Sequence, residues 1–337
     1  MIHPAVNEAG RVLDDGKPIG RPLADRLSLL EGEDVLDLAS LANKVRNRHA
    51  GGTEACSILN ARSGACGENC RFCAQSAHHE TCVEEYGLLR AGEIAAKAKS
   101  VHEKGVGHFG IVTSGYGYPE VTAEFEEICA AITLIHADLP GMHVCASLGV
   151  LGEEPVRRLA ECGIRHYNIN LQVAPPRYAE LIADTHPVED RIATIEGLRR
   201  RGVSVCCGAI FGVGESLADR IDLAYLLGEL QVAVIPLNVL IPVAGTPLEG
   251  QGPISVIEAV KSFALFRLIN PSKIIKFAAG RETLMNDFQG LLMLSGVNGI
   301  LTGGYLTTRG RSVEADRKLL DEVEKFHARH ETDHGEV

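Results

Sequence analysis

The 337 residues are 45% hydrophobic and suffice for one large α/β barrel or two ordinary domains. The 33 basic and 44 acidic residues give a formal net charge of −11, which argues against a nucleic-acid surface. No stretch approaches the ~18 consecutive apolar residues of a membrane helix. Residues 1–21 lack the compact apolar segment of a secretion signal, so the ten cysteines indicate thiols and metal in a reducing, cytoplasmic setting.

Residues 1–50 are predicted to form a helical extension, because their apolar residues recur at helical intervals (Leu23, Leu27, Leu30, Val35, Leu38, Ala39 and Ala42). We expect this extension to pack outside the main body, as a cap on one end of it or as a dimer contact. Residues 313–337 are charged, and we expect a helix followed by a flexible tail.

Apolar strands and helices alternate between the two ends of the chain. Strands are expected at residues 55–60, 108–113, 143–148, 166–171, 203–211, 234–240, 274–278 and 299–301, with helices between them. About eight βα units over ~250 residues match a (β/α)8 TIM-type barrel, which we assign to residues 51–312. A doubly wound open sheet is the alternative, because pattern reasoning rarely separates these two folds.

Three cysteines, Cys66, Cys70 and Cys73, stand at C-x3-C-x2-C spacing directly after the first expected strand. A structural zinc site uses four closed ligands, whereas three thiolates suit an iron–sulfur cubane with one iron left open. Gly64 allows a tight turn, and Phe72 can shield a cluster from water. Barrel active sites lie at the carboxyl ends of the strands, where this loop is expected.

The cysteine spacing is similar to that of the radical S-adenosylmethionine superfamily, and the segments Ser57–Cys66 and Arg71–Ser76 resemble the biotin synthase family. The resemblance extends from Cys56 to Leu306. It implies that Cys66, Cys70 and Cys73 hold a catalytic [4Fe–4S] cluster that binds S-adenosylmethionine. It also implies a ferredoxin or flavodoxin as electron donor, and a radical that removes hydrogen from dethiobiotin. Sulfur from an auxiliary iron–sulfur cluster is then inserted to give biotin. We also expect a homodimer.

The same resemblance assigns residues to cofactor and substrate. The segment Tyr167–Gln172 is similar to the family's Tyr-Asn-His-Asn-Leu-Asp, which implies that it lines the pocket, with a glutamine in place of the acid. His186 stands where the family has an arginine for the cofactor carboxylate. The cofactor-binding residues so implied are Phe72, Asn168, Asn170, Gln172, His186 and Arg191, and the substrate-binding residues are Asn170 and Asn238. Arg281 is a further candidate partner for a carboxylate.

Strand cysteines outside the loop suggest the auxiliary cluster. On composition alone they are more often small core residues. The resemblance places Cys145 and Cys206 at two of its cysteine ligands, but Gly110 and Lys276 replace the third cysteine and the arginine. We expect an auxiliary cluster of the two-iron or four-iron type with an altered ligand set, which is either Cys56, Cys145 and Cys206 or these three together with Cys207.

Two other functions stay open at this point. A related radical mutase or cofactor-maturation enzyme would need no sulfur donor, which the altered ligand positions favour. An iron–sulfur carrier or redox sensor is disfavoured, because a carrier has no use for a polar barrel pocket. His78 and His79, directly after the cysteine loop, could be ligands or acids, and we assign them to the surface loop. Cys82, Cys129 and Cys162 have no partner at ligand spacing and are assigned to the surface or core.

Overall fold

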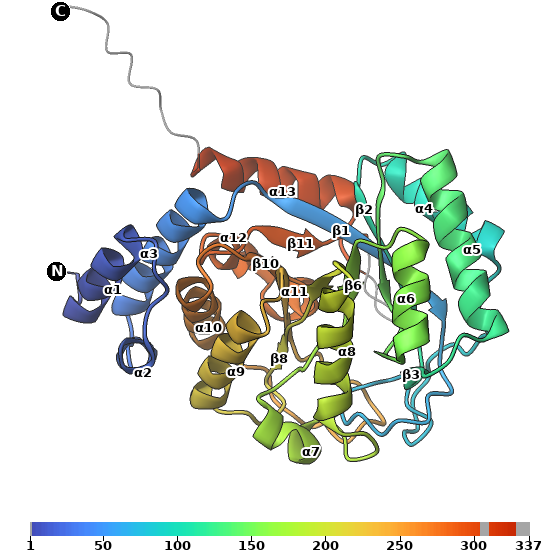
Figure 1. Cartoon of the computed structure of the whole chain (residues 1–337). Helices are drawn as coiled ribbons and strands as arrows, with labels where there is room; N and C mark the ends of the chain where they lie inside the picture. The colour runs from blue at the N-terminus through green and yellow to red at the C-terminus, as the bar shows by residue number, and fades with distance from the viewer. Residues whose placement is uncertain (1, 304–309, 328–337) are drawn as a thin grey trace, which may run out of the picture.

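The centre of the molecule is a closed ring of parallel strands. The computed structural model describes residues 2–303 and 310–327, and there the ring runs β1, β2, β4, β6, β7 with β8, β9, β10, β11 and back to β1 (Figure 1). This confirms the predicted TIM-type (β/α)8 barrel. The strands of the ring are β1 (Glu54–Arg62), β2 (His108–Thr113), β4 (His143–Ser147), β6 (His166–Asn168), β7 (Ser204–Cys206), β8 (Ala209–Phe211), β9 (Val234–Val239), β10 (Ile274–Phe277) and β11 (Gly299–Leu301).

Helices cover the outside of the ring because each has an apolar stripe at helical spacing. In α5, for example, Phe125, Ile128 and Ile132 are fully buried, and Thr122 caps the helix by accepting from the backbone N–H of Phe125 at 3.2 Å. The outer helices are α4 (Ala91–His102), α5 (Ala123–Asp138), α6 (Glu153–Glu161), α8 (Val188–Arg200), α9 (Leu217–Glu229), α10 (Val256–Ile269) and α12 (Gln289–Met293). No helix within the described ranges is long and apolar enough to cross a bilayer.

Short elements complete the ends of the barrel. A small parallel pair, β3 and β5, lies outside the ring. These elements are β3 (Gly117–Tyr118), β5 (Val150–Leu151), η1 (Pro175–Arg177), α7 (Tyr178–Leu181), α11 (Arg281–Leu284) and η2 (Asn286–Phe288).

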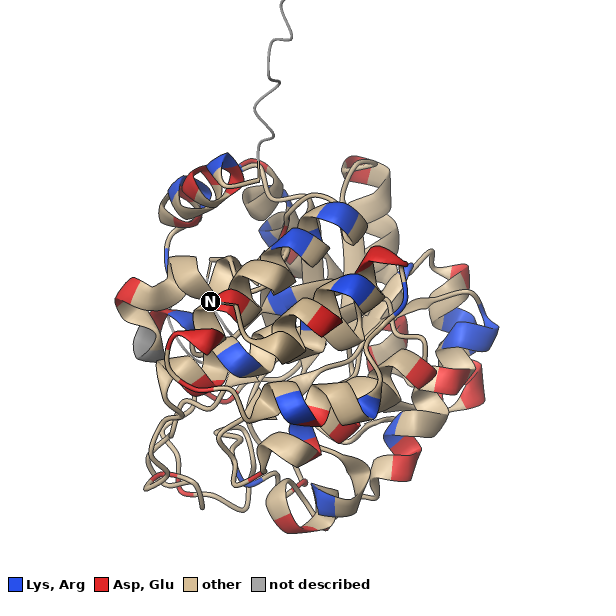
Figure 2. Cartoon of the chain, turned by 90° about the vertical axis from the view of Figure 1, so that its left-hand side faces the viewer, with Lys and Arg blue, Asp and Glu red and all other residues tan. Residues whose placement is uncertain are grey.

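Three helices at the N-terminus, α1 (Pro4–Asp14), α2 (Arg21–Ser28) and α3 (Asp34–His49), pack beside the barrel, with α3 along α10 (Figure 1). Figure 2 shows basic and acidic residues interleaved over the helices on this side. Near the other end of the chain, α13 (Val313–Lys325) is tied to α3, because Arg46 Nη2 lies 3.1 Å from the Glu324 carboxylate. The expected flexible tail falls, from residue 328 onward, outside the described residues.

The interior of the barrel is less filled than its outer face. Along β4 and β6 the helix-facing residues Val144, Ala146 and Tyr167 are at most 2% exposed. The alternating residues that face the interior, such as Cys145 and Asn168, keep part of their surface accessible. Barrel interiors are normally packed with bulky branched side chains, so this accessible interior, with thiols and amides on its wall, has room for a ligand.

The expected strand at residues 203–211 is interrupted between β7 and β8. At the interruption the backbone of Gly208 comes so close to β9 that an added Cβ would lie 1.7 Å from the carbonyl oxygen of Pro236. The N–H of Gly208 donates to the Asn170 side-chain oxygen at 2.9 Å, not to a neighbouring strand. Close approach of two backbones therefore breaks the strand, which a run of apolar residues did not reveal.

Candidate active site: cysteines at the mouth and inside the barrel

The loop after β1 brings Cys66, Cys70 and Cys73 together at the carboxyl end of the barrel. The loop folds back on itself through backbone bonds from Cys66 N to Gln75 O (3.0 Å) and from Cys73 N to Cys70 O (3.0 Å). Gly64 is required at its start, because φ is +73° and an added Cβ would lie 2.4 Å from Glu85 Cγ.

The electrostatics of this loop suit a metal cluster. Burial raises the pKa of the Cys70 thiol to about 12, and the charges of Cys73 and Cys66 add to the rise. Burial also raises the pKa of Cys73. Cys70 and Cys73 therefore become thiolates only when a cation displaces their protons, and with Cys66 beside them the donor set fits an iron–sulfur cluster. Phe72 is half-buried and packs against the hydrophobic core next to these thiols.

A polar network connects this loop to the segment after β6. Glu68, inside the loop, accepts from His186 Nδ1 at 2.7 Å, and His186 Nε2 lies 3.1 Å from Arg191 Nη2. Arg191 Nη1 in turn donates to the backbone oxygen of Asn170 at 3.2 Å. His186 is 4% exposed and both of its ring nitrogens have partners within the protein, so its contact with a cofactor stays a prediction.

The amide residues assigned from the resemblance occupy different environments. Asn168 Nδ2 donates to Ser147 Oγ at 3.1 Å, and both face the interior. Gln172 has φ +70°, and its buried Oε1 has no hydrogen-bond partner in the described part of the chain, so it is available to a ligand. Asn238 is 4% exposed; it donates to the backbone oxygen of Ala209 in β8 and accepts from the backbone N–H of Ala279, two residues after β10.

A second group of thiols lies inside the barrel. Cys145 and Cys206 face the interior from β4 and β7, and Cys56 joins them from β1. Burial raises the pKa of Cys145, and the neighbouring charges of Cys206 and Cys56 raise it further. At Gly110 an added Cβ would lie only 3.1 Å from Cys145 Sγ, so the smallest residue stands beside this thiol.

Lys276 reaches the same group from β10. Its Nζ donates to Cys56 Sγ at 2.7 Å and lies 3.1 Å from the Glu54 carboxylate. Burial alone would lower the pKa of Lys276, but the charges of Cys56, Cys206 and Glu54 outweigh burial and raise it. Lys276 therefore stays a cation, which can donate hydrogen bonds to sulfur but has no lone pair for a metal.

Cys207 does not turn toward this group. It is fully buried at the strand interruption, and its thiol is within hydrogen-bonding distance of the Leu171 backbone. The positive charge that works to lower the pKa of Cys207 is that of Arg191, whereas the one that works to lower the pKa of Cys206 is that of Lys276. Cys206 and Cys207 therefore point to opposite sides, as neighbours on a strand do, even though the strand is interrupted here. The structure favours Cys56, Cys145 and Cys206 as the thiols that face the interior together. Arg281, the other carboxylate candidate, is already paired with Asp316.

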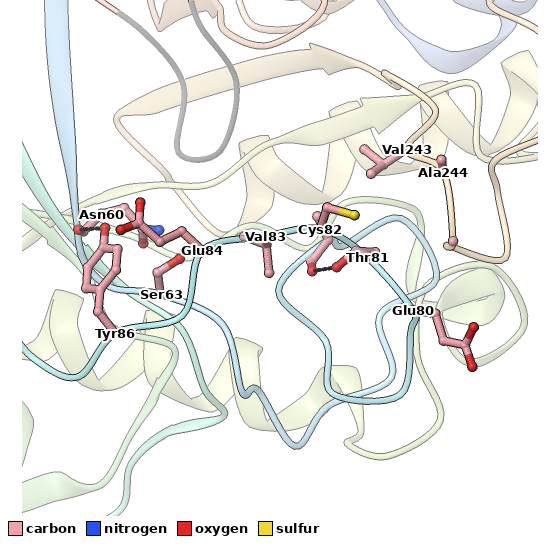
Figure 3. Close-up of a pocket in the computed structure, with 12 residues that line it drawn as sticks. Asn60, Ser63, Glu80, Thr81, Cys82, Val83, Glu84, Tyr86, Val243 and Ala244 are labelled. Atoms are coloured by element: carbon pink, nitrogen blue, oxygen red, sulfur yellow. Dashed lines mark hydrogen bonds between the residues drawn. The ribbon is translucent and has the colours of Figure 1, made fainter.

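A cavity of about 550 Å³ opens beside the cysteine loop (Figure 3). One wall contains residues 80–86 of the segment that follows the loop, and the other is the turn at residues 243–245 after β9. Asn60, 8% exposed, contributes a side-chain oxygen that has no partner among the described residues. Neither this cavity nor the role of Glu68 was predicted, because both depend on segments far apart in the sequence.

A parallel (β/α)8 barrel with a three-cysteine loop at its mouth is the arrangement of a radical S-adenosylmethionine enzyme. The comparisons agree: residues 61–227 match the Radical SAM superfamily, and residues 236–324 match the Biotin and Thiamin Synthesis associated domain.

Biotin synthase of Chlorobaculum parvum is 59% identical over 329 residues, covering 96% of this chain and 98% of the relative. Biotin synthase of Chlorobium limicola is 58% identical and covers 97% and 98%. The chain therefore belongs to the biotin synthase family, as the sequence motifs predicted.

Solved structures confirm the fold. Methylornithine synthase (PylB) has a TM-score of 0.80 at 18% identity, covering 93% of this chain and 95% of that one. HydG, a maturase of the [FeFe]-hydrogenase, has a TM-score of 0.80 at 17% identity and covers 95% and 74%.

Proposed function

We propose that this chain is a biotin synthase, a radical sulfurtransferase that inserts sulfur into dethiobiotin to form biotin. The observation that carries the proposal is the identity of 58–59% with biotin synthases along almost the whole chain. The barrel supports it, because Cys66, Cys70 and Cys73 lie together at the mouth and further thiols lie inside.

The residues at the mouth would hold a [4Fe–4S] cluster and S-adenosylmethionine, which together supply the hydrogen-abstracting radical chemistry. The protein's part is to hold dethiobiotin between the two thiol groups and to keep water out. Asn168, Asn170 and Gln172 extend from the interior toward the mouth on one strand and its continuation. Their amides supply donors and acceptors for ribose hydroxyls or for the polar groups of the substrate.

We further propose that Cys56, Cys145 and Cys206 hold an auxiliary iron–sulfur cluster that donates the sulfur. Three thiols beside the ammonium group of Lys276 favour an anionic cluster, because Lys276 compensates part of its charge. Metal analysis of anaerobically reconstituted protein distinguishes the types. A two-iron cluster gives about six irons per chain, a four-iron cluster gives about eight, and about four would remove the auxiliary cluster.

Three parts of the proposal concern the setting of the enzyme. A ferredoxin or flavodoxin supplies the electrons, dethiobiotin is the substrate, and the active unit is a homodimer. A reducing cytoplasm suits the chain, since all ten cysteines are free thiols. Light scattering coupled to gel filtration tests the dimer directly.

The function is tested by anaerobic incubation with S-adenosylmethionine and a one-electron reductant, with and without dethiobiotin. We expect 5′-deoxyadenosine to form at an appreciable rate only when dethiobiotin is present, and biotin to accompany it. Production of 5′-deoxyadenosine with no biotin would instead indicate a mutase or a maturation enzyme that inserts no sulfur.

A further inference from the structure

Two thiols on the outside of the barrel face each other across a pair of outer helices. Cys129 lies in α5 and is 1% exposed, and Cys162 directly follows α6 and is 9% exposed. The two helices follow the neighbouring strands β2 and β4 and pack side by side (Figure 1). Spacing along the chain does not pair these cysteines, because they lie on different helices.

An ion pair fixes the level at which the two helices meet. Arg158, on α6, donates to both carboxylate oxygens of Glu126, on α5, at 2.9 and 2.7 Å. Cys129 lies about one turn after Glu126, on the same face of α5. Cys162 likewise lies about one turn after Arg158. Since the two helices return from parallel strands in the same direction, the thiols meet one turn beyond the ion pair, and they form a hydrogen bond with each other.

The two thiols differ in how readily they lose a proton. Arg158 Nη1 donates to Cys162 Sγ at 3.2 Å. The hydrogen bond from Cys129 lowers the pKa of Cys162, burial opposes this effect, and the charge of Arg158 lowers the pKa further. The same hydrogen bond raises the pKa of Cys129, and burial adds to the rise. Cys162 is therefore the thiol that becomes a thiolate, while Cys129 keeps its proton and donates to it.

Cys162 also lies at the edge of the protein surface. Its chain neighbours Glu161 and Gly163 are exposed, whereas Cys129 is enclosed between the helices. A molecule as small as hydrogen peroxide therefore reaches Cys162 first. Thiols that combine access, a stabilised thiolate and a second thiol within reach are the ones that peroxides oxidise selectively.

We propose that Cys162 and Cys129 form a site of reversible oxidation by hydroperoxides, with Cys162 as the nucleophile and Cys129 as the resolving thiol. The thiolate of Cys162 attacks one peroxide oxygen and becomes a sulfenic acid, while the O–O bond breaks and the other oxygen leaves as hydroxide, which takes up a proton. The sulfur of Cys129 then attacks the sulfenic sulfur, an S–S bond replaces the S–O bond, and the second oxygen leaves as water. Two electrons pass from the thiols to the peroxide, so one hydrogen peroxide gives one disulfide and two waters.

The test exposes anaerobically reconstituted, full-length protein to a small excess of hydrogen peroxide. Samples are alkylated without reduction, digested and analysed by tandem mass spectrometry. We expect peptides linked through Cys129 and Cys162, which form at least about tenfold faster than the exposed thiol of Cys82 is oxidised. Dithiothreitol should restore both thiols. In Cys129→Ser the sulfenic acid has no resolving thiol, so dimedone should label Cys162.

Cys82→Ser is the matched control, because it removes an exposed thiol outside the pair, and it should form the linked peptides like the unmodified protein. Equal iron content before oxidation shows that the variants have folded. The proposal is wrong if Cys162 is still a free thiol once Cys82 has been oxidised. It is also wrong if dimedone labels Cys162 equally with and without Cys129. These outcomes do not depend on the radical chemistry, because the pair uses none of the thiols at the mouth or inside the barrel.

Discussion

At the scale of single residues, two positions inside the barrel depart from the ligand pattern that the resemblance implies. Gly110 and Lys276 occupy the positions where the family resemblance implies a cysteine and an arginine. The structure places Cys56 beside Lys276, and it turns Cys207 away. Cys56 thus supplies a third interior thiol from another strand.

Substitution of interior cysteines tests this assignment. We expect Cys145→Ala to lose the iron of the auxiliary cluster and all biotin formation, while the iron bound at the mouth remains. Cys207→Ala is the matched change at a buried thiol, and we expect it to keep full iron content. Iron and sulfide analysis with visible absorption measures both. Loss of auxiliary iron in Cys207→Ala and its retention in Cys145→Ala would reverse the assignment.

At the scale of elements, the strands and outer helices were predicted well because apolar periodicity reports on them directly. The interruption at Cys207 and Gly208 was not, because it arises from the approach of Pro236 on the next strand. The contact between Glu68 and His186 joins residues 118 positions apart, and no local pattern signals it. Sequence reasoning found the ligand-bearing loop, but not the long-range contacts that orient its neighbours.

A buried ion pair contributes to the attachment of α13 to the barrel. Asp316 accepts from Arg281 at 2.7 and 2.9 Å, and the two residues are 2% and 0% exposed. We expect Asp316→Ala to lower the free energy of unfolding by about 3 kcal/mol, because it removes the carboxylate that pairs with both ends of a buried guanidinium and leaves only Glu282, 3.0 Å from Nη2. Urea denaturation measures this.

Lys325→Ala removes an exposed pair on the same helix, and we expect it to change stability by less than about 0.5 kcal/mol. Equal effects of the two substitutions would show that the buried pair does not hold α13.

Acidification should reduce the stability of the contacts at the end of α13, because His327, two residues after this helix, becomes protonated. Burial lowers the pKa of this imidazole, and Arg46 lowers it further, while Glu324 opposes them. The folded state therefore binds fewer protons than the unfolded state, and stability falls as the pH drops below the unfolded pKa of about 6.5. We expect a loss of about 1 kcal/mol or less at pH 5.5, because the site lies near the surface and water screens it.

The measurement is urea denaturation at pH 7.5 and pH 5.5, with His327→Gln as the comparison. The variant should show a smaller difference between the two pH values. An unchanged difference would mean that other groups cause the pH dependence.

At the scale of the whole molecule, the barrel carries two groups of thiols at different depths. One group lies on the loop at the carboxyl ends of the strands, and the other lies inside, on β1, β4 and β7. Residues with amide side chains lie between them on β6 and its continuation. This order matches the proposed reaction, in which carbon radicals form near the mouth and take up sulfur from within.

The origin of the sulfur atom tests this account most directly. The protein is reconstituted with heavy-isotope sulfide, freed of excess sulfide and given dethiobiotin, S-adenosylmethionine and a reductant for a single turnover. Mass spectrometry of the product should show biotin that carries the heavy isotope, and Cys145→Ala should yield none. Biotin with light sulfur from a protein that retains its labelled cluster would contradict the account.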